Sequence, residues 1–311
     1  MRSVLVTGGA GFIGSHLAET LLQRGDRVRI LDNFSTGHRA NLAHLRDDIE
    51  MIEGDLRNPA AVAQATAGVE LVFHQAALPS VPRSVLDPAT TNAVNITGTL
   101  NLLLAAREAQ VRRVVVASSS SVYGDTPTLP KHEAMAPNPR SPYALSKLAT
   151  EQYACIFAGL YPIEAVALRY FNVFGPRQDP SSQYAGVIAR FCTAALQGEA
   201  CTIYGDGEQS RDFTYVSDVV AANLQAAEAP AANGQFMNIA CGVRTTLLDL
   251  VAELQALIGH DLPIIHAEPR LGDVRHSLAE ISQAQQLIGY APQVRFSDGL
   301  AQTLRWYQGG R

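Results

Sequence analysis

The sequence has no long apolar run and no excess of positive charge. No uninterrupted apolar stretch approaches the roughly 20 residues that a membrane-spanning helix requires. The formal net charge of −5 removes the electrostatic basis for binding a polyanion. We therefore expect neither a membrane nor a nucleic acid as a partner.

Cysteine is scarce, and its spacing is not that of metal ligands or redox pairs. The four cysteines contain no Cys-x-x-Cys pair. They are typical of small buried residues in a reducing compartment, and we predict no metal site. Only seven residues precede Gly8, where a glycine-rich motif begins, which leaves no room for a signal peptide. We expect a cytoplasmic protein.

The residues that are present predict an α/β fold with two parts. Hydrophobic residues make up 47% and charged residues 17% of 311 positions, as in globular proteins. Short apolar runs alternate with helical patterns through residue 170, which predicts a doubly wound parallel sheet of the Rossmann type. The rest is turn-rich and indicates a smaller α+β lobe. We expect a dinucleotide-binding domain over 1–171, to which the chain returns near 213–240, and a substrate-binding lobe mainly over 172–311.

A glycine-rich turn stands between the first predicted strand and the first predicted helix. Gly8-Gly9-Ala10-Gly11-Phe12-Ile13-Gly14 follows the apolar run at 3–7 directly. Its glycines permit a tight turn and a close approach of pyrophosphate, and the helix N-terminus offers free N–H groups to the phosphates. This context predicts a dinucleotide site at Gly8, Gly11, Phe12 and Ile13.

Two acids end the second and third predicted strands. Asp32 lies near the ~20-residue offset at which an acid bonds the adenine ribose, and it would repel a 2′-phosphate. We therefore expect NAD and not NADP, although Arg39 lies nearby and Asp32 could instead cap a loop. Asp55 would meet the adenine or begin a helix as its N-cap, and the sequence leaves both open. The same site is expected to include Asn33, Leu56, Gln75, Ala76 and Ala77.

The segment Ser141-Pro142-Tyr143-Ala144-Leu145-Ser146-Lys147 predicts a catalytic pair. Pro142 suits the first turn of a helix, which places Tyr143 and Lys147 on one face. An ammonium beside a phenol lowers the phenol pKa from about 10 toward neutrality, which would give a general base. A half-buried tyrosine and a surface lysine on an ordinary amphipathic helix are the alternative. The serines at 118–121 follow the fifth predicted strand, so one of them could meet Tyr143.

Together these motifs resemble the extended short-chain dehydrogenase/reductase family. The resemblance rests on Gly8-x-x-Gly11-x-x-Gly14, on the serines before Val122-Tyr123-Gly124, and on Tyr143-x-x-x-Lys147. It continues over nearly the whole chain in the segments 169–176, 205–207, 211–218 and 270–273. Those later segments resemble the nucleotide-sugar branch of the family, above all the UDP-hexose 4-epimerases.

The resemblance implies a role for individual residues. Tyr143 would be the acid/base, Lys147 its partner, and Ser119 the catalytic hydroxyl. Arg211 and Arg270 would clamp the diphosphate and uridine ribose, although both are equally compatible with surface ion pairs. The other implied contacts are Asn95 on the cofactor side, Asn172 at the diphosphate, Asp273 at the uridine ribose, and Arg83, Ser120 and Ser277 around the sugar.

The resemblance also narrows the reaction. Relatives that eliminate water carry an Asp-Glu pair after the catalytic hydroxyl, and decarboxylases carry a Glu there, whereas this chain has Ser120 and Ser121. The expected reaction is 4-epimerisation of a UDP-hexose through a transient 4-keto sugar with tightly bound NAD. The small Ser277 favours acceptance of N-acetylated sugars as well.

Two other functions stay open at this point. The first is a UDP-glucuronate 4-epimerase, in which Arg83 or Arg275 faces the carboxylate. The second is a non-catalytic NAD-binding regulator, although such a protein would not need Ser119, Tyr143 and Lys147. The family resemblance further implies a homodimer through the helices near 97–109 and 144–159.

Overall fold

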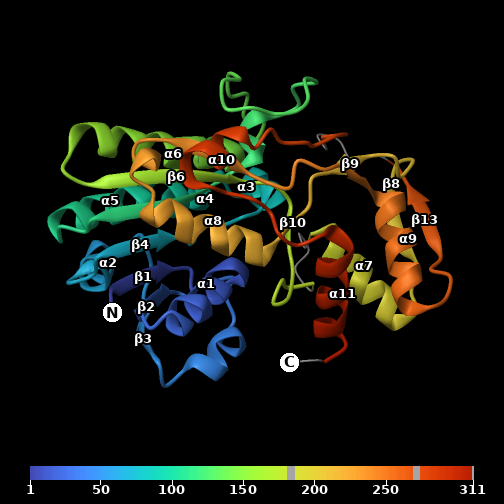
Figure 1. The fold of residues 1–311 in the computed structure, drawn as a ribbon, viewed down its shortest axis with the longest axis horizontal. Helices are drawn as coiled ribbons and strands as arrows, with labels where there is room; N and C mark the ends of the chain where they lie inside the picture. The colour runs from blue at the N-terminus through green and yellow to red at the C-terminus, as the bar shows by residue number, and fades with distance from the viewer. Residues whose placement is uncertain (181–185, 269–273, 310–311) are drawn as a thin grey trace.

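The computed structural model describes residues 1–180, 186–268 and 274–309, and its centre is a seven-stranded sheet (Figure 1). The strand order is β3-β2-β1-β4-β5-β6-β11, and every neighbouring pair is parallel. This order confirms the predicted doubly wound fold. The strands are β1 (Ser3–Thr7), β2 (Arg27–Asp32), β3 (Ile49–Glu53), β4 (Leu71–His74), β5 (Arg113–Ser119), β6 (Glu164–Tyr170) and β11 (Phe236–Ile239).

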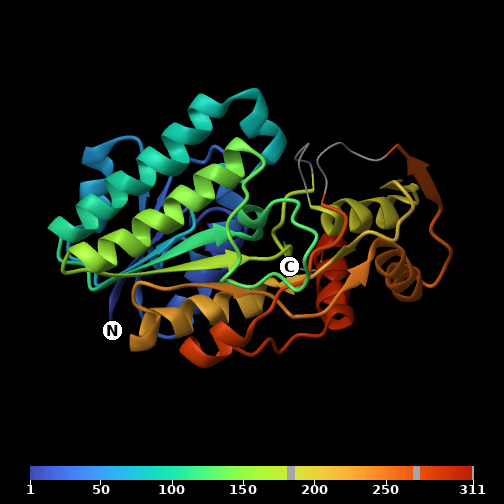
Figure 2. The same cartoon turned by 90° about the horizontal axis from the view of Figure 1, so that it is seen from above.

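Helices cover both faces of this sheet, as Figure 2 shows from above. β1 illustrates why: Val4 and Val6 pack into one apolar core and Leu5 into the other, because successive strand residues point to opposite faces. One face carries α1 (Phe12–Gln23), α8 (Val216–Glu228) and α10 (Ser282–Ile288), and the other carries α2 (Pro59–Thr66), α5 (Gly98–Glu108) and α6 (Pro142–Leu160).

The residues at the start of α6 favour a helix N-terminus, and short helical segments elsewhere connect the larger elements. The Ser141 side chain accepts a hydrogen bond from the Ala144 N–H, and Pro142 occupies the first turn, so the chain at this point favours a helix start. The short segments are η1 (Arg39–Leu45), α3 (Val81–Leu86), α4 (Pro88–Asn92), η2 (Ala93–Thr97), η3 (Ser120–Tyr123) and η4 (Pro230–Ala232).

A smaller lobe lies beside the carboxyl ends of the sheet strands (Figure 1). Its core is rich in aromatic and aliphatic side chains from several helices, including Phe174, Phe191, Phe213 and Leu250. The chain returns from this lobe to the large sheet through α8 and β11. The lobe contains α7 (Val187–Gln197), α9 (Leu247–Ile258), α11 (Phe296–Tyr307) and the strand pairs β7 (Val173–Phe174) with β10 (Thr214–Tyr215), β9 (Ser210–Arg211) with β12 (Thr245–Thr246), and β8 (Cys201–Tyr204) with β13 (Ile264–Ala267).

The outer face of α6 carries exposed apolar side chains. Leu145, Ile156 and Leu160 are 54%, 48% and 71% exposed and share one side of the helix. The homodimer expected through this region stays a prediction, because the structure contains one chain. In the described residues, no helix is both long enough and apolar enough to span a membrane.

Candidate active site

A cavity of about 760 Å³ follows the carboxyl ends of the sheet strands, where ligands bind in open α/β folds. With one exception, its wall contains every residue that the sequence assigned to the cofactor. These are Gly8, Gly11, Phe12, Ile13, Asp32, Asn33, Asp55, Leu56, Gln75, Ala76, Ala77, Tyr143 and Lys147. The sequence motifs therefore meet in one place in the fold.

At two positions of the glycine turn in the cavity wall, any side chain would collide with the neighbouring backbone. A Cβ atom at Gly8 would lie 2.7 Å from the Ala76 Cα, and one at Gly14 would lie 2.1 Å from the Gly8 carbonyl oxygen. α1 begins at Phe12 and its N-cap, Gly11, makes no side-chain cap, so the first N–H groups of the helix remain available to an anion. The turn fits the pyrophosphate of a dinucleotide.

Asp32, predicted to bind the adenine ribose, lines the cavity with acceptor capacity to spare. Its two carboxylate oxygens accept the N–H groups of Ala10 at 2.9 Å and Phe34 at 2.8 Å, which leaves further lone pairs for ribose hydroxyls. Arg39 pairs with Glu53 and stacks on the Phe34 ring, and it is not part of the cavity wall. Arg39 is therefore not placed in this cavity to hold the 2′-phosphate of NADP, and the site fits NAD.

Asp55 lines the cavity, and it is not a helix N-cap. Asn58 has that role for α2, since its side chain accepts the Ala60 N–H at 3.0 Å. Asp55 instead accepts hydrogen bonds from Arg57, at 2.9 Å from Nε, and from the Asn33 side chain at 2.7 Å. The Arg57 hydrogen bond is the main reason why the pKa of Asp55 is lowered.

Asn95 is the predicted cofactor residue that does not line the cavity. Its side chain is buried, accepts the Leu78 N–H at 2.8 Å and donates to the Ser146 hydroxyl at 2.9 Å. It therefore links the segment after β4 to α6. A direct contact between Asn95 and the cofactor is not supported by this geometry.

Ser119, Tyr143 and Lys147 lie together in the wall of the same cavity. The Ser119 hydroxyl lies near enough to the Tyr143 side chain to lower its pKa. The Lys147 Nζ donates to the Ala117 carbonyl at 2.8 Å, which ties α6 to the end of β5. The neighbouring Ser118 donates at 2.9 Å to Glu151. The two serines thus have different partners, and the hydroxyl that faces the tyrosine is that of Ser119.

The expected lowering of the Tyr143 pKa is wrong for this structure. Burial raises the pKa of Tyr143, and the nearby Ser119 hydroxyl opposes the rise without cancelling it. Burial also lowers the pKa of Lys147 to about 8. The physical reason is that the Lys147 ammonium donates to a carbonyl of β5 and does not stabilise the phenolate directly.

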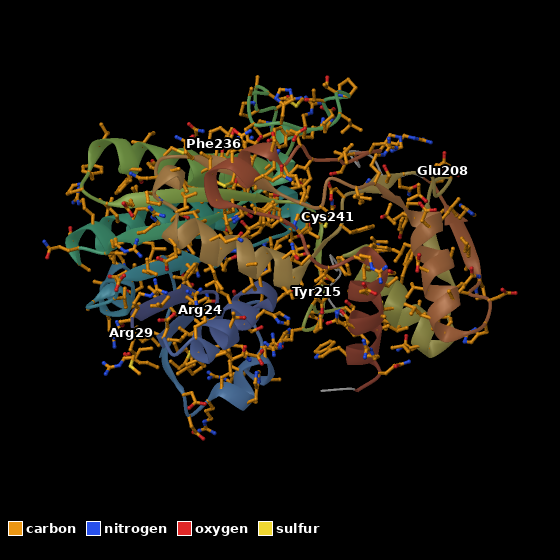
Figure 3. All side chains as sticks on the ribbon, viewed as in Figure 1. Arg24, Arg29, Glu208, Tyr215, Phe236 and Cys241 are labelled. Carbon is orange, nitrogen blue, oxygen red and sulfur yellow. The ribbon has the colours of Figure 1, made fainter. Side chains whose placement is uncertain are left out.

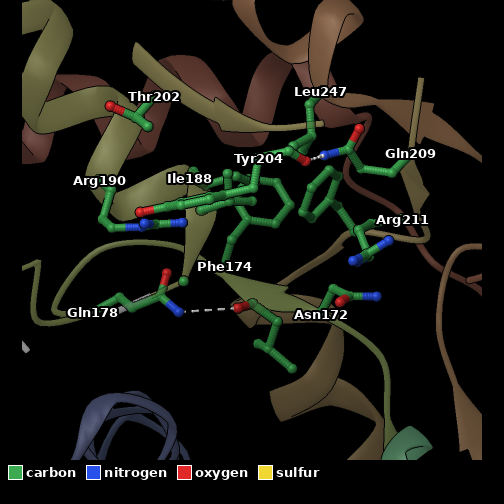
Figure 4. Close-up of a pocket in the computed structure, with 14 residues that line it drawn as sticks. Asn172, Phe174, Gln178, Ile188, Arg190, Thr202, Tyr204, Gln209, Arg211 and Leu247 are labelled. Carbon is green, nitrogen blue, oxygen red and sulfur yellow. Dashed lines mark hydrogen bonds between the residues drawn. The ribbon is translucent and has the colours of Figure 1, made fainter. Parts of the chain in front are cut away.

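A second cavity of about 240 Å³ adjoins the first (Figure 4). Asn172 and Arg211 lie on one side of it, and Arg190 and Gln178 on the opposite side. Asn172 and Gln178 belong to both cavities, so the two spaces share a wall. An anion in the smaller cavity would lie near arginines from α7 and β9.

The sequence reasoning missed several residues of both cavities. The smaller cavity also contains Thr202 and Tyr204 of β8, and Gln209, whose side chain donates to the Tyr204 carbonyl at 2.7 Å. The turn Gly205-Asp206-Gly207 lies between these residues in the sequence and is the feature that could have indicated them. The larger cavity includes Ser35, Thr36, Gly37 and His38, a polar loop directly after the predicted Asp32-Asn33 site.

The remaining predicted substrate residues fall into three groups. Arg83 and Ser120 line the larger cavity. Ser277 lies beside β9, where its N–H donates to the Ser210 carbonyl at 3.0 Å, and it is in the wall of neither cavity. Arg270 and Asp273 lie outside the described residues.

A doubly wound sheet whose dinucleotide turn shares a cavity with a Tyr-x-x-x-Lys helix defines an extended short-chain dehydrogenase/reductase. Residues 4–240 match the family model of the NAD dependent epimerase/dehydratase family. The chain belongs to this family, and its cofactor is NAD.

Individual relatives resemble the chain over nearly its whole length. It is 42% identical to a UDP-glucose 4-epimerase of Mycolicibacterium smegmatis, with 98% of each chain covered. The structure of a UDP-N-acetylglucosamine 4-epimerase from Methanobrevibacter ruminantium, in complex with UDP-N-acetylmuramic acid, matches at a TM-score of 0.95 with 40% identity, covering 100% of this chain and 99% of that one. The Thermus thermophilus UDP-glucose 4-epimerase, solved with NAD, matches at 0.90 with 36% identity, covering 99% and 100%.

Proposed function

We propose that this protein catalyses the NAD-dependent 4-epimerisation of a UDP-hexose. The observation that carries the proposal is the shared wall between two cavities, one with the dinucleotide turn and Ser119, Tyr143 and Lys147, the other with Asn172 and Arg211. The names of the relatives above support a UDP-sugar as the substrate.

The groups around Tyr143 in the larger cavity are suited to proton transfer to and from the sugar. Tyr143 would act in its phenolate form, which the positive charge of bound NAD would favour: the phenolate would take the proton from the sugar 4-hydroxyl and later return it, with the Ser119 hydroxyl beside it in the cavity wall. Bound NAD, held by the glycine turn and the Asp32 side, would supply a reversible hydride acceptor for C4 of the sugar. Lys147 holds α6 against the end of β5, which fixes the position of Tyr143.

The absence of a carboxylate beside Ser119 favours epimerisation over elimination or decarboxylation. Ser120 lines the cavity with a hydroxyl. Among the described residues, the carboxylates of the cavity wall are Asp32 at the end of β2, Asp55 after β3, and Asp179, which pairs with His38. None of them belongs to the segment that follows the catalytic serine.

The diphosphate anchor explains how both faces of the keto sugar can be presented. Asn172 and Arg211 hold the nucleotide part in the smaller cavity, and the sugar can then turn about its link to the diphosphate in the larger one. We assign UDP-glucose and UDP-galactose as substrates, together with their 2-N-acetyl counterparts. For the latter the proposal rests on the named relative that acts on UDP-N-acetylglucosamine, because Ser277 lines neither cavity.

A UDP-glucuronate 4-epimerase is the second candidate, and the position of Arg83 favours it. This arginine lines the larger cavity, where a cation would attract a C6 carboxylate. A preference for the acidic sugar over neutral sugars would select this candidate.

The test is conversion of five UDP-sugars by purified protein without added NAD. We expect interconversion of UDP-glucose with UDP-galactose and of UDP-N-acetylglucosamine with UDP-N-acetylgalactosamine, with slower use of UDP-glucuronate. A deuterium at C4 should stay in the product, because the same hydride returns. Binding of NAD without conversion of any sugar would indicate the non-catalytic regulator instead.

A further inference from the structure

Asp212 is a fully buried carboxylate directly after β9, next to Arg211. Its oxygens accept backbone N–H groups of Cys241 at 2.9 Å, Gly242 at 3.0 Å and Ala279 at 3.1 Å. In the described part of the chain, no ion pair with an arginine or lysine is formed by this carboxylate, and its hydrogen bonds come from backbone N–H groups, as for an anion held in a backbone nest.

These donors bring together segments that are distant in the sequence. Cys241 and Gly242 follow β11, 29 and 30 positions from Asp212, and Ala279 lies 67 positions away. Cys241 lies at the junction between the large sheet and the smaller lobe (Figure 3). One side chain thus fixes the end of β11 and the segment around residue 279 to the strand that carries Arg211.

The same stretch of backbone holds the predicted substrate contacts. The Asp212 carbonyl accepts a hydrogen bond from the Asn172 side chain at 3.1 Å. Two residues earlier, the Ser210 carbonyl accepts the Ser277 N–H at 3.0 Å. Because successive residues of an extended chain point to opposite sides, the Asp212 carboxylate faces the interior while Arg211 lines the smaller cavity.

We infer that Asp212 is a positioning residue for the nucleotide-sugar, which holds Asn172, Arg211 and the segment around Ser277 in the arrangement that binds it. This role rests on the proposed function. Asparagine has nearly the same shape, but it has one acceptor oxygen and turns an NH₂ group toward backbone donors. Asp212→Asn should therefore loosen these segments without creating a cavity in the core.

The matched control is Asp218→Asn. Asp218 is also buried and also accepts two backbone N–H groups, from Gln293 at 3.0 Å and Val294 at 3.2 Å. Those partners tie α8 to the segment before α11, and none of them lines either cavity. The two variants make the same chemical change at two places.

The experiment measures the Kd for UDP, the KM and kcat for UDP-galactose, and the NAD content. For Asp212→Asn we expect the Kd and KM to rise at least fivefold, with kcat and NAD content within twofold of wild type. For Asp218→Asn we expect all four to stay within twofold. An unchanged Kd and KM in Asp212→Asn would overturn the inference, and so would a loss of kcat at constant KM.

Wild-type protein that binds UDP but converts no sugar would refute the proposed function while the binding comparison still decides the role of Asp212. If Asp212→Asn does not fold, hydrogen exchange of the wild type replaces it. UDP should then slow exchange of the Cys241, Gly242 and Ala279 amides at least tenfold, and leave those of Gln293 and Val294 unchanged. Equal exchange with and without UDP at the first three amides would overturn the inference.

Discussion

The cofactor cavity and the smaller cavity beside it are constructed in different ways. The cofactor cavity consists largely of strand ends and the glycine turn, and its shape depends on backbone positions such as Gly8 and Gly14. The smaller cavity is lined by several stretches that are separate in the sequence, including those that contain Asn172, Arg190 and Arg211. The first is a property of the sheet, whereas the second depends on how distant segments are held together.

The largest expected effect is a loss of catalysis that leaves nucleotide binding in both cavities unchanged. Tyr143→Phe removes the group that transfers the proton, so kcat should fall on the order of 10³-fold. The Kd for UDP and the NAD content should stay within twofold, because the Tyr143 hydroxyl is one of many groups in the cofactor cavity and lies outside the smaller one. Steady-state turnover of UDP-galactose, UDP calorimetry and NAD released on denaturation provide the three measurements.

Tyr153→Phe is the control for that change. Tyr153 lies on the same helix, packs against the core and is in the wall of neither cavity. Its turnover should remain near that of wild type. Activity of Tyr143→Phe within tenfold of wild type would remove the assigned acid/base.

The next effect concerns the backbone that forms the cofactor cavity. In Gly14→Ala the new methyl would lie 2.1 Å from the Gly8 carbonyl oxygen and 2.8 Å from its carbonyl carbon, so the turn must move. We expect the NAD content of the purified protein to fall at least tenfold. Gly159→Ala on α6 is the control, because nothing lies within 4 Å of its added Cβ.

The control should also become slightly more stable, since alanine is favoured over glycine inside a helix by about 0.5–1 kcal/mol. NAD content and the midpoint of thermal unfolding measure the two outcomes. Full NAD occupancy in Gly14→Ala would contradict the role given to this turn.

The same contrast explains which features the sequence could predict. The strand, turn and helix around Gly8, and the cap of α6 at Ser141, depend on residues that are adjacent in the chain. Their geometry follows from local backbone preferences, so fold class and cofactor site could be predicted. Side-chain direction could not: the sequence allowed Lys147 to face Tyr143, whereas packing directs its ammonium to the Ala117 carbonyl.

Long-range packing accounts for the other residues that the sequence could not place. Asn95 was assigned to the cofactor, but its side chain bonds to Leu78 and Ser146 in the interior. Asp212 belonged to a noted motif without a role, because its partners lie up to 67 positions away. No local pattern contains the information that those segments meet.

The smallest expected effect tests whether the backbone segments bonded to Asp212 can loosen while the fold keeps its stability. Burial raises the pKa of Asp212 to about 6 in the folded protein, above about 4 for an unfolded aspartate. The folded protein therefore binds more protons between these values, so the stability that this group contributes is fully present below about pH 4 and is lost as the pH rises to about 6. Lowering the pH from about 7.5 to about 5 should stabilise the wild type by on the order of 1 kcal/mol relative to Asp212→Asn.

Urea unfolding of both proteins at the two pH values measures this difference, and other titrating groups cancel in it when they lie far from residue 212. The difference in stability between the wild type and the asparagine variant should be smallest at the higher pH, where the wild type has to keep a charge buried. A variant that is as stable as the wild type and yet binds UDP more weakly would separate the positioning of the smaller cavity from the stability of the fold. Equal pH dependence in both proteins would instead show that Asp212 is ionised as readily in the folded state as in the unfolded one.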